Sequence, residues 1–459
     1  MATSLETNMG NNPDVVLEKV RQQFDAAPYP NIAPTASINY TADFLFVHNL
    51  QTPYYLRHQR VLDTAATTML DAGCGSGCNA LALAIANPGA KIVGVDLSVK
   101  SVELATQRLH HHGFTNCEFH AIALEELPSL GMTFDYINCD EVLSLLPDLT
   151  TGLRALQAVL KPKGIIRANV HSAPQRFNYY AAQEMCAMMG LLDGTPEEFE
   201  IGLVRETMEA LRDDVVLKQA TWSNLSEIDE VVLMNHLLQG DRGYTVPELF
   251  AALRAANLEF ISMVDWRQWE LLSLFNNPGD LPTFWAMSLP ELSVEEQLTL
   301  YELMQPKNRL LDFWCGHPLL DPVPAPVVTW SLADWQGTIV HLHPQLRTDE
   351  VRQQLHRCIR EHVGFCVSQH LSHPALTDVT LESTVAALLV PLWDAPQPIS
   401  ALVEHWLRLK PLDPVTLIPV SPAQAEMDVI QVLTRLESYL YVLVDRPLSA
   451  QYSAASSAS

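Results

Sequence analysis

Between residues 51 and 173 the hydrophobic positions follow two alternating patterns. Short apolar runs, typical of buried strands, are each followed by a longer run with apolar residues at helical spacing. The short runs are TTMLDAG, KIVGVDLS, NCEFHAIA, TFDYINCD and GIIRANVH, and the helical runs are NALALAIAN, KSVELATQRLHHHG and LTTGLRALQAVLK. Strands that alternate with helices predict right-handed crossovers and therefore an α/β fold with a Rossmann-like, doubly wound parallel sheet.

The pattern changes after residue 173. Residues 174–320 are mainly helical, with two strand candidates, LEFISMVDW and RLLDFWCGH. The helix before the first strand has a clear start, because Thr245 and Glu248 form a capping box and Pro247 stands in the first turn. We expect a mainly helical middle domain that regulates the protein or gates its substrate.

The proline-rich segment GHPLLDPVPAPV predicts a linker. Beyond it, three helical patterns and a strand predict a small winged-helix-like domain that ends in a disordered tail. At the other end we expect a polar arm with a short helix at Val15–Phe24, followed by an irregular stretch that serves as a lid. The predicted domains are the arm at 1–50, the core at 51–173, the middle domain at 174–320, the winged-helix-like domain at 328–447 and the tail at 448–459.

A glycine motif marks the first strand-to-helix turn. It reads D-x-G-x-G-x-G, from Asp71 to Gly77, whereas a dinucleotide motif would place its third glycine where Cys78 stands. Glycines there permit positive φ and let a ligand lie against the main chain. Asp96 ends the second strand, roughly 20 residues further on, where a carboxylate can accept the hydroxyls of a ribose. Both features share one edge of the sheet, which predicts a nucleoside-bearing ligand.

These residues resemble the class I S-adenosylmethionine-dependent methyltransferases. The resemblance implies S-adenosyl-L-methionine as the cofactor, with its methionyl end over the glycine motif and its ribose held at the end of the second strand. Where that family often carries an acid for the adenine, this chain has Ala123, so adenine recognition would fall to the main chain there or to Glu125. Cys139 would pack against the ligand or the core. The predicted cofactor-binding residues are Asp71, Gly73, Cys74, Gly75, Gly77, Asp96, Leu97, Ala123, Leu124 and Cys139.

A closer likeness extends over most of the chain. The segments FDAAPYP, FDYINCDEVLSLLP and RANVHSAP are similar to motifs of bacterial protein lysine methyltransferases that carry a methyltransferase regulatory domain. This resemblance implies a protein lysine amine as the methyl acceptor. Two alternatives stay open: a non-catalytic cofactor-binding scaffold, and a small-molecule methyltransferase whose pocket would be lined by Tyr179, Tyr180, Met185, Met188 and Met189.

Four residues are candidates for the acceptor site. Tyr29 would fold over the cofactor as a lid or anchor the arm to the core. Asp140 and Glu141 follow a strand end, where they would attract a cationic amine and accept its proton, or would act as helix-start acids. His171, just past the fifth strand, is placed to serve as a base near neutral pH or to be a solvated side chain. We expect no metal, because the adjacent histidines at 110–112 splay around a helix.

Composition narrows the class of partner. The chain has 28 Lys and Arg against 53 Asp and Glu, and this net charge of −25 disfavours nucleic acid and anionic membrane surfaces. No basic and apolar leader opens the sequence and no apolar run reaches the ~20 residues of a membrane span, so we expect a cytoplasmic protein. The eight cysteines form no C-x-x-C pair, which indicates reduced thiols. Because the C-terminal region is acidic, we expect it to bind protein or form a homodimer rather than bind DNA.

Overall fold

The computed structural model describes residues 28–223, 227–319 and 323–446, together with residues 18, 21, 22, 24 and 25. The helix predicted at Val15–Phe24 lies largely outside the described residues. The tail predicted at 448–459 lies entirely outside them.

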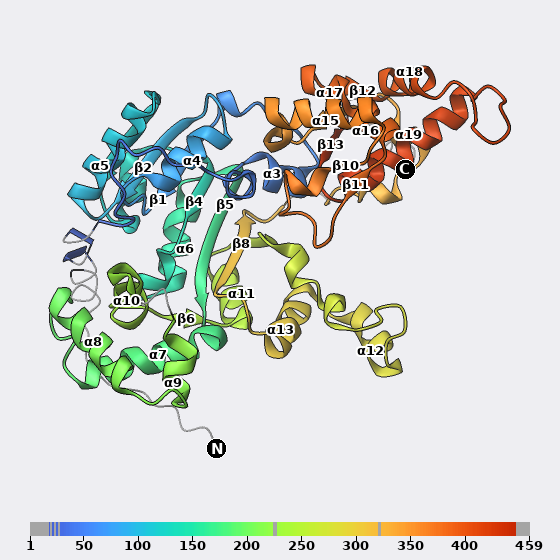
Figure 1. The fold of residues 1–459 in the computed structure, drawn as a ribbon. Coiled ribbons are helices and arrows are strands. Elements are labelled where there is room, and N and C mark those ends of the chain that lie inside the picture. The colour runs from blue at the N-terminus through green and yellow to red at the C-terminus, as the bar shows by residue number, and fades with distance from the viewer. Residues whose placement is uncertain are drawn as a thin grey trace, which may run out of the picture.

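A single sheet of eight strands forms the centre of the molecule (Figure 1). The strand order is β3-β2-β1-β4-β5-β8-β7, and the short strand β6 pairs with β5. Strands β1 to β5 run parallel, β8 is antiparallel to β5, and β7 is antiparallel to β8. The predicted α/β, Rossmann-like fold class is confirmed. The strands are β1 (Thr68–Ala72), β2 (Lys91–Asp96), β3 (Cys117–Ala121), β4 (Phe134–Cys139), β5 (Leu160–Ser172), β6 (Gly243–Tyr244), β7 (Glu259–Met263) and β8 (Leu310–Gly316).

The helices between the parallel strands begin where the sequence supplies caps. Helix α5 (Val99–His111) starts at Ser98, whose side chain accepts the amide of the third residue in, and α6 (Leu149–Ala158) starts at Asp148 in the same way. Helix α4 (Cys78–Ala86) starts directly at Gly77, and seven of its nine residues are buried. A helix that is apolar on nearly every side must be covered on every side, and α4 lies between the sheet, α5 and the N-terminal helix α2 (Ala42–Val47).

The last two strands of the sheet come from the segment predicted as a separate helical domain. Strands β7 and β8 follow the helical insertion, so the sheet ends at residue 316 and not at the predicted boundary of 173. The reason is burial: β5 is buried from Gly164 to Ser172, so its backbone needs a hydrogen-bonded neighbour on each edge, and β8 supplies one with Phe313 and Trp314, both fully buried. Local alternation of strands and helices cannot reveal a strand that returns antiparallel from so far along the chain.

The rest of the middle segment divides into two groups of helices. Helices α7 (Ala173–Met188), α8 (Glu198–Ala210) and α10 (Asp229–His236) share a small core of their own. Helices α11 (Val246–Ala255) and α13 (Val294–Met304) instead pack against the main core under the sheet. Helix α11 begins with the capping box of Thr245 and Glu248 that the sequence predicts. The remaining helices here are α9 (Val216–Thr221) and α12 (Thr283–Ser288).

The C-terminal region has a separate core around a three-stranded antiparallel sheet of order β12-β9-β13. Its winged-helix character stays a prediction. The N-terminal helices α2 and α3 (Gln51–His58) pack into this core through Phe46 and Tyr55, and the Tyr55 hydroxyl donates to Glu437 at 3.0 Å (Figure 1). The segment predicted as a free arm thus joins the two regions from residue 42 onward. The larger elements here are β9 (Ile339–Leu342), α15 (Asp349–Glu361), α16 (Ser383–Leu389), β12 (Gln397–Pro398), α18 (Ile399–Leu409), α19 (Pro422–Glu437) and β13 (Val442–Asp445).

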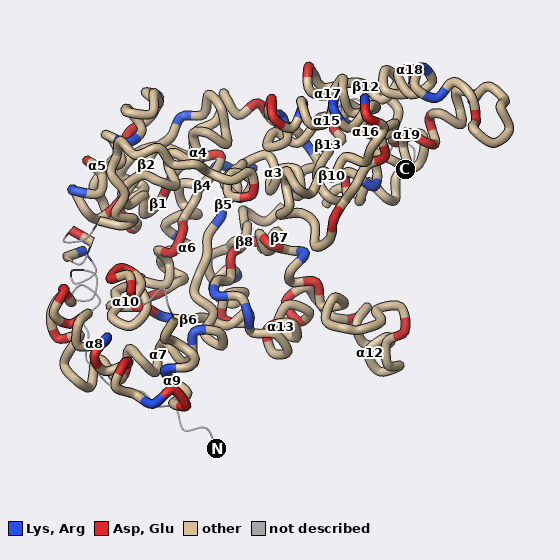
Figure 2. The backbone as a smooth tube through the Cα atoms, in the orientation of Figure 1, with Lys and Arg blue, Asp and Glu red and all other residues tan. Residues whose placement is uncertain are grey.

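Acidic side chains are spread over the whole described chain, including α8, α10 and the C-terminal helices (Figure 2). That the protein does not bind nucleic acid stays a prediction from its net charge. Among the helices in the described ranges, none has both the length and the apolar content that crossing a membrane requires.

Candidate active site

A cavity of about 790 Å³ opens at the carboxyl ends of the parallel strands. Its walls come from the glycine motif, the end of β2, the loops after β3 and β4, the end of β5, helix α10 and Arg309, which precedes β8. Open α/β sheets bind their ligands at this edge, where the strand order reverses on either side of β1 and β4. The cavity therefore lies at the edge of the sheet where the sequence predicts a nucleoside-bearing ligand.

The glycines of the motif are required first by the protein's own packing. Gly73 and Gly75 have φ of +83° and +48°, which side chains disfavour. A Cβ on Gly73 would lie 2.2 Å from Cγ2 of Val142, and one on Gly75 would lie 2.3 Å from the carbonyl oxygen of Tyr29. The motif thus lets two neighbouring segments, one of them bearing Tyr29, approach the loop closely.

The backbone amides of the glycine loop already donate hydrogen bonds within the protein. The amides of residues 73 and 74 donate to the carbonyl of Val95, that of Ser76 donates to the carbonyl of Tyr29, and that of Gly77 donates to the carbonyl of Cys74. The amide of Gly75 donates to Oδ2 of Asp96 at 2.9 Å. These donors cannot also bind an anion, so the loop suits a cationic group, which needs acceptors, better than a carboxylate.

A strap of residues 29–33 crosses the glycine loop. The hydroxyl of Ser76 donates to the carbonyl of Pro30 at 2.8 Å, and the buried Arg108 donates to the carbonyls of Ser76 and Ile32 at 2.8 and 2.7 Å. The ring of Tyr29 lines the cavity and remains 43 % exposed. Partial burial, followed by the charges of Glu141 and Glu230, raises the pKa of the Tyr29 phenol. The strap holds Tyr29 where a lid residue is expected.

Asp96 faces the cavity from the end of β2. Its two oxygens accept the amides of Gly75 and Ser98, each at 2.9 Å, while burial raises the pKa of the carboxyl above its ordinary value. A carboxylate has about four acceptor positions, so each oxygen can still accept one ribose hydroxyl. Leu97, Ala123 and Leu124 lie beside it on the cavity wall, but the amide of Ala123 already donates to Glu126 at 3.0 Å. Adenine recognition through that amide is therefore blocked.

Three of the predicted cofactor residues lie behind the cavity wall. Asp71 is buried with Oδ1 accepting from Asn138 at 2.9 Å, Gly77 packs against Ala105 at the start of α4, and the Cys139 side chain lies in the main core. Burial raises the pKa of the Cys139 thiol, which keeps it protonated. These residues shape the loop and the strands, and none of them lines the cavity.

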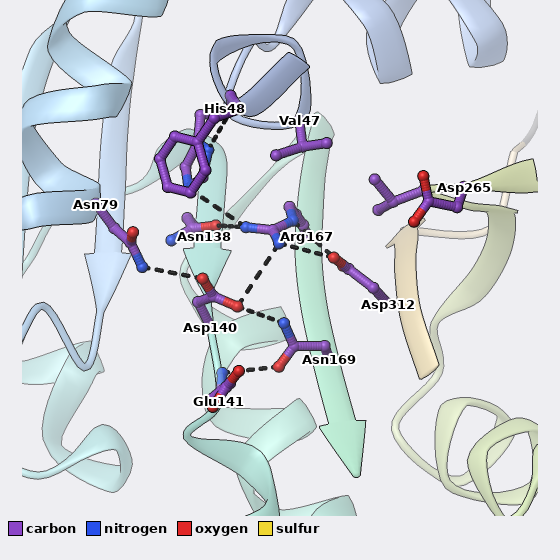
Figure 3. Close-up of polar contacts among 12 residues, drawn as sticks. Val47, His48, Asn79, Asn138, Asp140, Glu141, Arg167, Asn169, Asp265 and Asp312 are labelled. Carbon is purple, nitrogen blue, oxygen red and sulfur yellow. Dashed lines mark hydrogen bonds and ion pairs between the residues drawn. The ribbon is translucent and has the colours of Figure 1, made fainter. Parts of the chain in front are cut away.

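Asp140 is anchored on every side at the other end of the cavity (Figure 3). It accepts from Nδ2 of Asn79 at 3.0 Å and from Nδ2 of Asn169, and it lies 3.6 Å from the guanidinium of Arg167. Burial alone would raise the pKa of Asp140, but Arg167, His48 and the two amides hold it below its ordinary value. An ionised carboxylate with these partners is poorly suited to take a proton, so the expectation that Asp140 acts as a base finds no support in this geometry.

Arg167 lies at the centre of a buried polar network between β4 and β8 (Figure 3). Its guanidinium donates to both oxygens of Asp312, at 2.7 and 3.2 Å, and to Oδ1 of Asn138 at 2.9 Å. Asn138 in turn donates to Asp71, so the acid of the glycine motif is connected through Arg167 to strand β8. Burial raises the pKa of Asp71 to about 7 and that of Asp312 to about 6.

His171 and Glu141 face the cavity next to Arg309. Nδ1 of His171 lies 2.5 Å from Oδ1 of the buried Asp241, and Nε2 lies 3.3 Å from Nη1 of Arg309. Glu141, at a positive φ of 56°, pairs with the same guanidinium through its carboxylate. Glu230 lines the cavity from α10. The structure thus brings the four predicted acceptor-site residues, Tyr29, Asp140, Glu141 and His171, to one cavity.

Sequence reasoning missed several residues of the site, and it placed others wrongly. No local pattern marks Tyr40, Asn79, Glu230, Asp241 or Arg309, because each reaches the site from a different element. Conversely, the five residues assigned to a small-molecule pocket are not among the residues that line the cavity, and Met188 and Met189 are 80 % and 74 % exposed. Tyr180 instead packs beside Gly243 of β6, and Met185 packs on the core shared by α7, α8 and α10.

Comparison with known proteins identifies the domain. Residues 63–229 match the family described as a methyltransferase domain. The chain is 26 % identical over 341 residues to an uncharacterised protein of a Synechococcus species, covering 72 % of this chain and 77 % of that protein. It is 35 % identical over 112 residues to a ubiquinone biosynthesis O-methyltransferase of Bordetella avium, which is 24 % of this chain and under half, 45 %, of that enzyme's length.

The fold as a whole is similar to a solved structure. PKMT2 from Rickettsia typhi, in complex with AdoHcy, superposes with a TM-score of 0.56 at 18 % identity, over 91 % of this chain and 77 % of that one. The shared fold includes regions beyond the methyltransferase domain. The predicted recognition, enzyme class and cofactor are confirmed: residues 63–229 form an S-adenosylmethionine-dependent methyltransferase domain.

Proposed function

We propose that the protein transfers the methyl group of S-adenosylmethionine to a protein lysine amine. The observation that carries the proposal is the charge of the cavity, whose walls hold five carboxylates against two guanidinium groups. Such a field attracts a cationic amine and repels anionic acceptors. The carboxylates are Asp96, Glu125, Asp140, Glu141 and Glu230, and the guanidinium groups are those of Arg21 and Arg309.

The residues present fit the cofactor. Asp96 keeps acceptor positions for the ribose, and Gly73 and Gly75 leave a bare loop whose amides are already satisfied, which favours the ammonium of the methionyl end. When bound, S-adenosylmethionine supplies a methyl group on a positively charged sulfur. The chain must then align an acceptor with that methyl, exclude water and remove a proton. Tyr29 and the apolar residues of α10 would exclude the water.

The lysine assignment joins the acidic cavity to the likeness with PKMT2 of Rickettsia typhi. Glu230 is half-buried on α10, where it can meet a cationic side chain that enters from solvent. In our proposal Asp140 stays ionised and contributes negative charge, Glu141 binds the amine, and His171 receives its proton. The expected role of residues 328–447 in protein interaction or dimerisation stays a prediction.

Labelled cofactor tests the proposal directly. The purified protein is incubated with methyl-labelled S-adenosylmethionine and a cell extract, and the label is followed into protein and small-molecule fractions. We expect label in protein, located by mass spectrometry on lysine, and less of it with the Asp96→Ala variant when the cofactor concentration is below the wild-type Kd. Label confined to small molecules would contradict the lysine assignment. No label, together with cofactor binding measured by calorimetry, would indicate a scaffold.

A small-molecule acceptor is the second candidate. It is favoured by the apolar part of the cavity, which includes Leu146 and where Leu145 packs with Met234 of α10 and with Leu238 just after that helix. A closed apolar wall of this kind suits a flat or aliphatic acceptor as well as a lysine stem. The same fractionation experiment separates the two candidates, because only one of them labels protein.

A further inference from the structure

A buried carboxylate orients the histidine of the cavity. Asp241, in the turn between α10 and β6, contacts Nδ1 of His171 with one oxygen, and its other oxygen accepts from Arg176 at 2.8 Å and from Gln183 at 3.0 Å. The side chains of Asp241 and Arg176 are completely buried. Although burial acts to raise the pKa of Asp241, the bonds from His171, Arg176 and Gln183 hold it below its ordinary value.

This arrangement fixes the tautomer of the imidazole. An ionised carboxylate only accepts hydrogen bonds, so Nδ1 of His171 must carry the proton that faces Asp241. Nε2 then carries the lone pair, which agrees with the guanidinium of Arg309 as its neighbour at 3.3 Å, since a guanidinium can only donate. Once the Arg309 guanidinium is displaced, this lone pair is open to the cavity, which is what a general base requires.

We infer that Asp241 is a positioning residue that sets His171 as the proton acceptor of the reaction, and that Arg309 and Glu141 form an ion-paired cover over Nε2. The inference rests on the proposed function and names the residues that regulate access to its base. It joins four segments that are separate in the sequence: the end of β5, the turn before β6, the loop after β4 and the residue before β8.

The ion pair of Arg309 and Glu141 that covers Nε2 can be displaced by another cation. The side chains of Arg309 and Glu141 are 45 % and 37 % exposed, and an ion pair this exposed contributes little stability. The side chains of Asp241 and Arg176 behind the histidine are, by contrast, fully buried. A cationic amine that enters the cavity can take the place of the Arg309 guanidinium beside Glu141, so one cation replaces another and Nε2 becomes free to receive a proton.

The proposed step balances. The ammonium of the acceptor loses one proton to Nε2 of His171, and the nitrogen lone pair so exposed forms the bond to the methyl carbon. The bond between that carbon and the sulfur of the cofactor breaks, and its electron pair stays on sulfur, which becomes neutral. The product is a methylated ammonium, and the proton on His171 passes to solvent.

The variant Asp241→Asn tests the positioning role. Arg176 can only donate, and Gln183 donates through Nε2, so both will hold the amide oxygen and turn its NH₂ toward Nδ1 of His171, which moves the ring proton to Nε2. We expect kcat to fall on the order of 100-fold or more, as for loss of a general base, with unchanged affinity for S-adenosylhomocysteine. Asp229→Asn, an exposed carboxylate of α10 paired with Arg205, is the matched control and should keep its kcat.

Two readouts separate this role from a structural one. The first is ¹⁵N NMR of labelled histidines in the protein without cofactor, which should show the Nδ1–H tautomer for His171 and the Nε2–H tautomer in Asp241→Asn. The second is the acid limb of the pH profile of kcat, which should be lost or displaced in the variant. The charged groups around His171 that bear on this limb are Asp241, Arg309, Glu141 and, behind Asp241, Arg176.

The variant Arg309→Ala tests the cover. It should lower the acceptor KM on the order of two- to fivefold, because the amine no longer competes with the guanidinium for Glu141. A raised acceptor KM would contradict the proposal that Arg309 and Glu141 cover Nε2 of His171.

The orienting role has its own contrary results. An Nε2–H tautomer in the wild-type protein, or a kcat within threefold of wild type in Asp241→Asn, would overturn it even if lysine methylation is found. Absence of protein labelling by the wild-type enzyme would instead overturn the proposed function and leave the NMR result standing.

Discussion

The two ends of the cavity are built in different ways. The cofactor end is formed by a short continuous stretch, residues 71–97, and its polar groups are held mainly by backbone hydrogen bonds. The acceptor end collects His171, Glu230 and Arg309 from elements far apart in the chain and holds its charges through ion pairs between side chains. The cofactor end is a local sequence motif that other chains can share, whereas the acceptor end depends on the tertiary fold of this chain.

The largest effect should come from the network that joins the two ends. The variant Arg167→Met leaves Asp312 and Asp140 without their buried cation, and breaking a buried pair in this way costs about 3–5 kcal/mol. Urea denaturation measures the free energy of unfolding. The double variant Arg167→Met/Asp312→Leu should recover part of the loss, and a single variant as stable as wild type would show that the ends are independent.

The glycine loop offers the next test. An alanine at Gly75 must adopt a left-handed backbone, at about 1–2 kcal/mol, and must also push back the carbonyl of Tyr29, at about 1–3 kcal/mol. Gly113 is the matched control, because it has φ of +85° and its Cβ would contact no atom within 4 Å. Thermal melting should show Gly75→Ala as clearly less stable than Gly113→Ala. Equal losses of stability in the two variants would mean that residues 29–33 shift away from the added Cβ without measurable cost.

Cofactor binding should respond to Asp96 more modestly. The variant Asp96→Ala removes an acceptor of charge-assisted hydrogen bonds, which is worth about 1–3 kcal/mol of binding free energy. Calorimetry with S-adenosylhomocysteine measures the change in Kd. Glu118→Gln, which alters a half-exposed carboxylate on the adjacent strand β3, should leave Kd unchanged. An unaltered Kd in Asp96→Ala would remove the ribose assignment.

The smallest effect is expected at the mouth of the acceptor end. The variant Glu230→Gln should raise the KM for a lysine peptide by a few-fold at most, since a half-exposed charge contributes under about 1 kcal/mol. Added salt should erase the difference between variant and wild type. A larger KM change that survives high salt would mean that Glu230 binds the acceptor directly.

The comparison also explains what could be read from the sequence. The spacing of Gly73, Gly75 and Asp96 is set by one turn, the helix α4 and the strand β2, so the pattern predicts both the fold and the cofactor. His171 could be proposed as a base because it ends a strand, but its partner Asp241 stands 70 residues away, and no periodicity connects them. Arg309 was missed for the same reason.

Two expected roles depend on groups that the folded chain already uses in hydrogen bonds. Asp140 has the right position for a base, yet Asn79, Asn169 and Arg167 occupy it. Ala123 stands at the predicted adenine position, yet its amide caps a helical turn through Glu126. In both cases a hydrogen bond that only the folded chain reveals decides the chemistry.

The late arrival of β8 has a consequence for biosynthesis. As the polypeptide emerges from the ribosome, β5 is made long before β8, so it must wait as an unpaired edge with Arg167 lacking its partner Asp312. A charged side chain in that waiting edge discourages pairing with a neighbouring nascent chain. Arg167, which pairs with Asp312 in the folded protein, would thereby reduce aggregation of the nascent chain before β8 is synthesised.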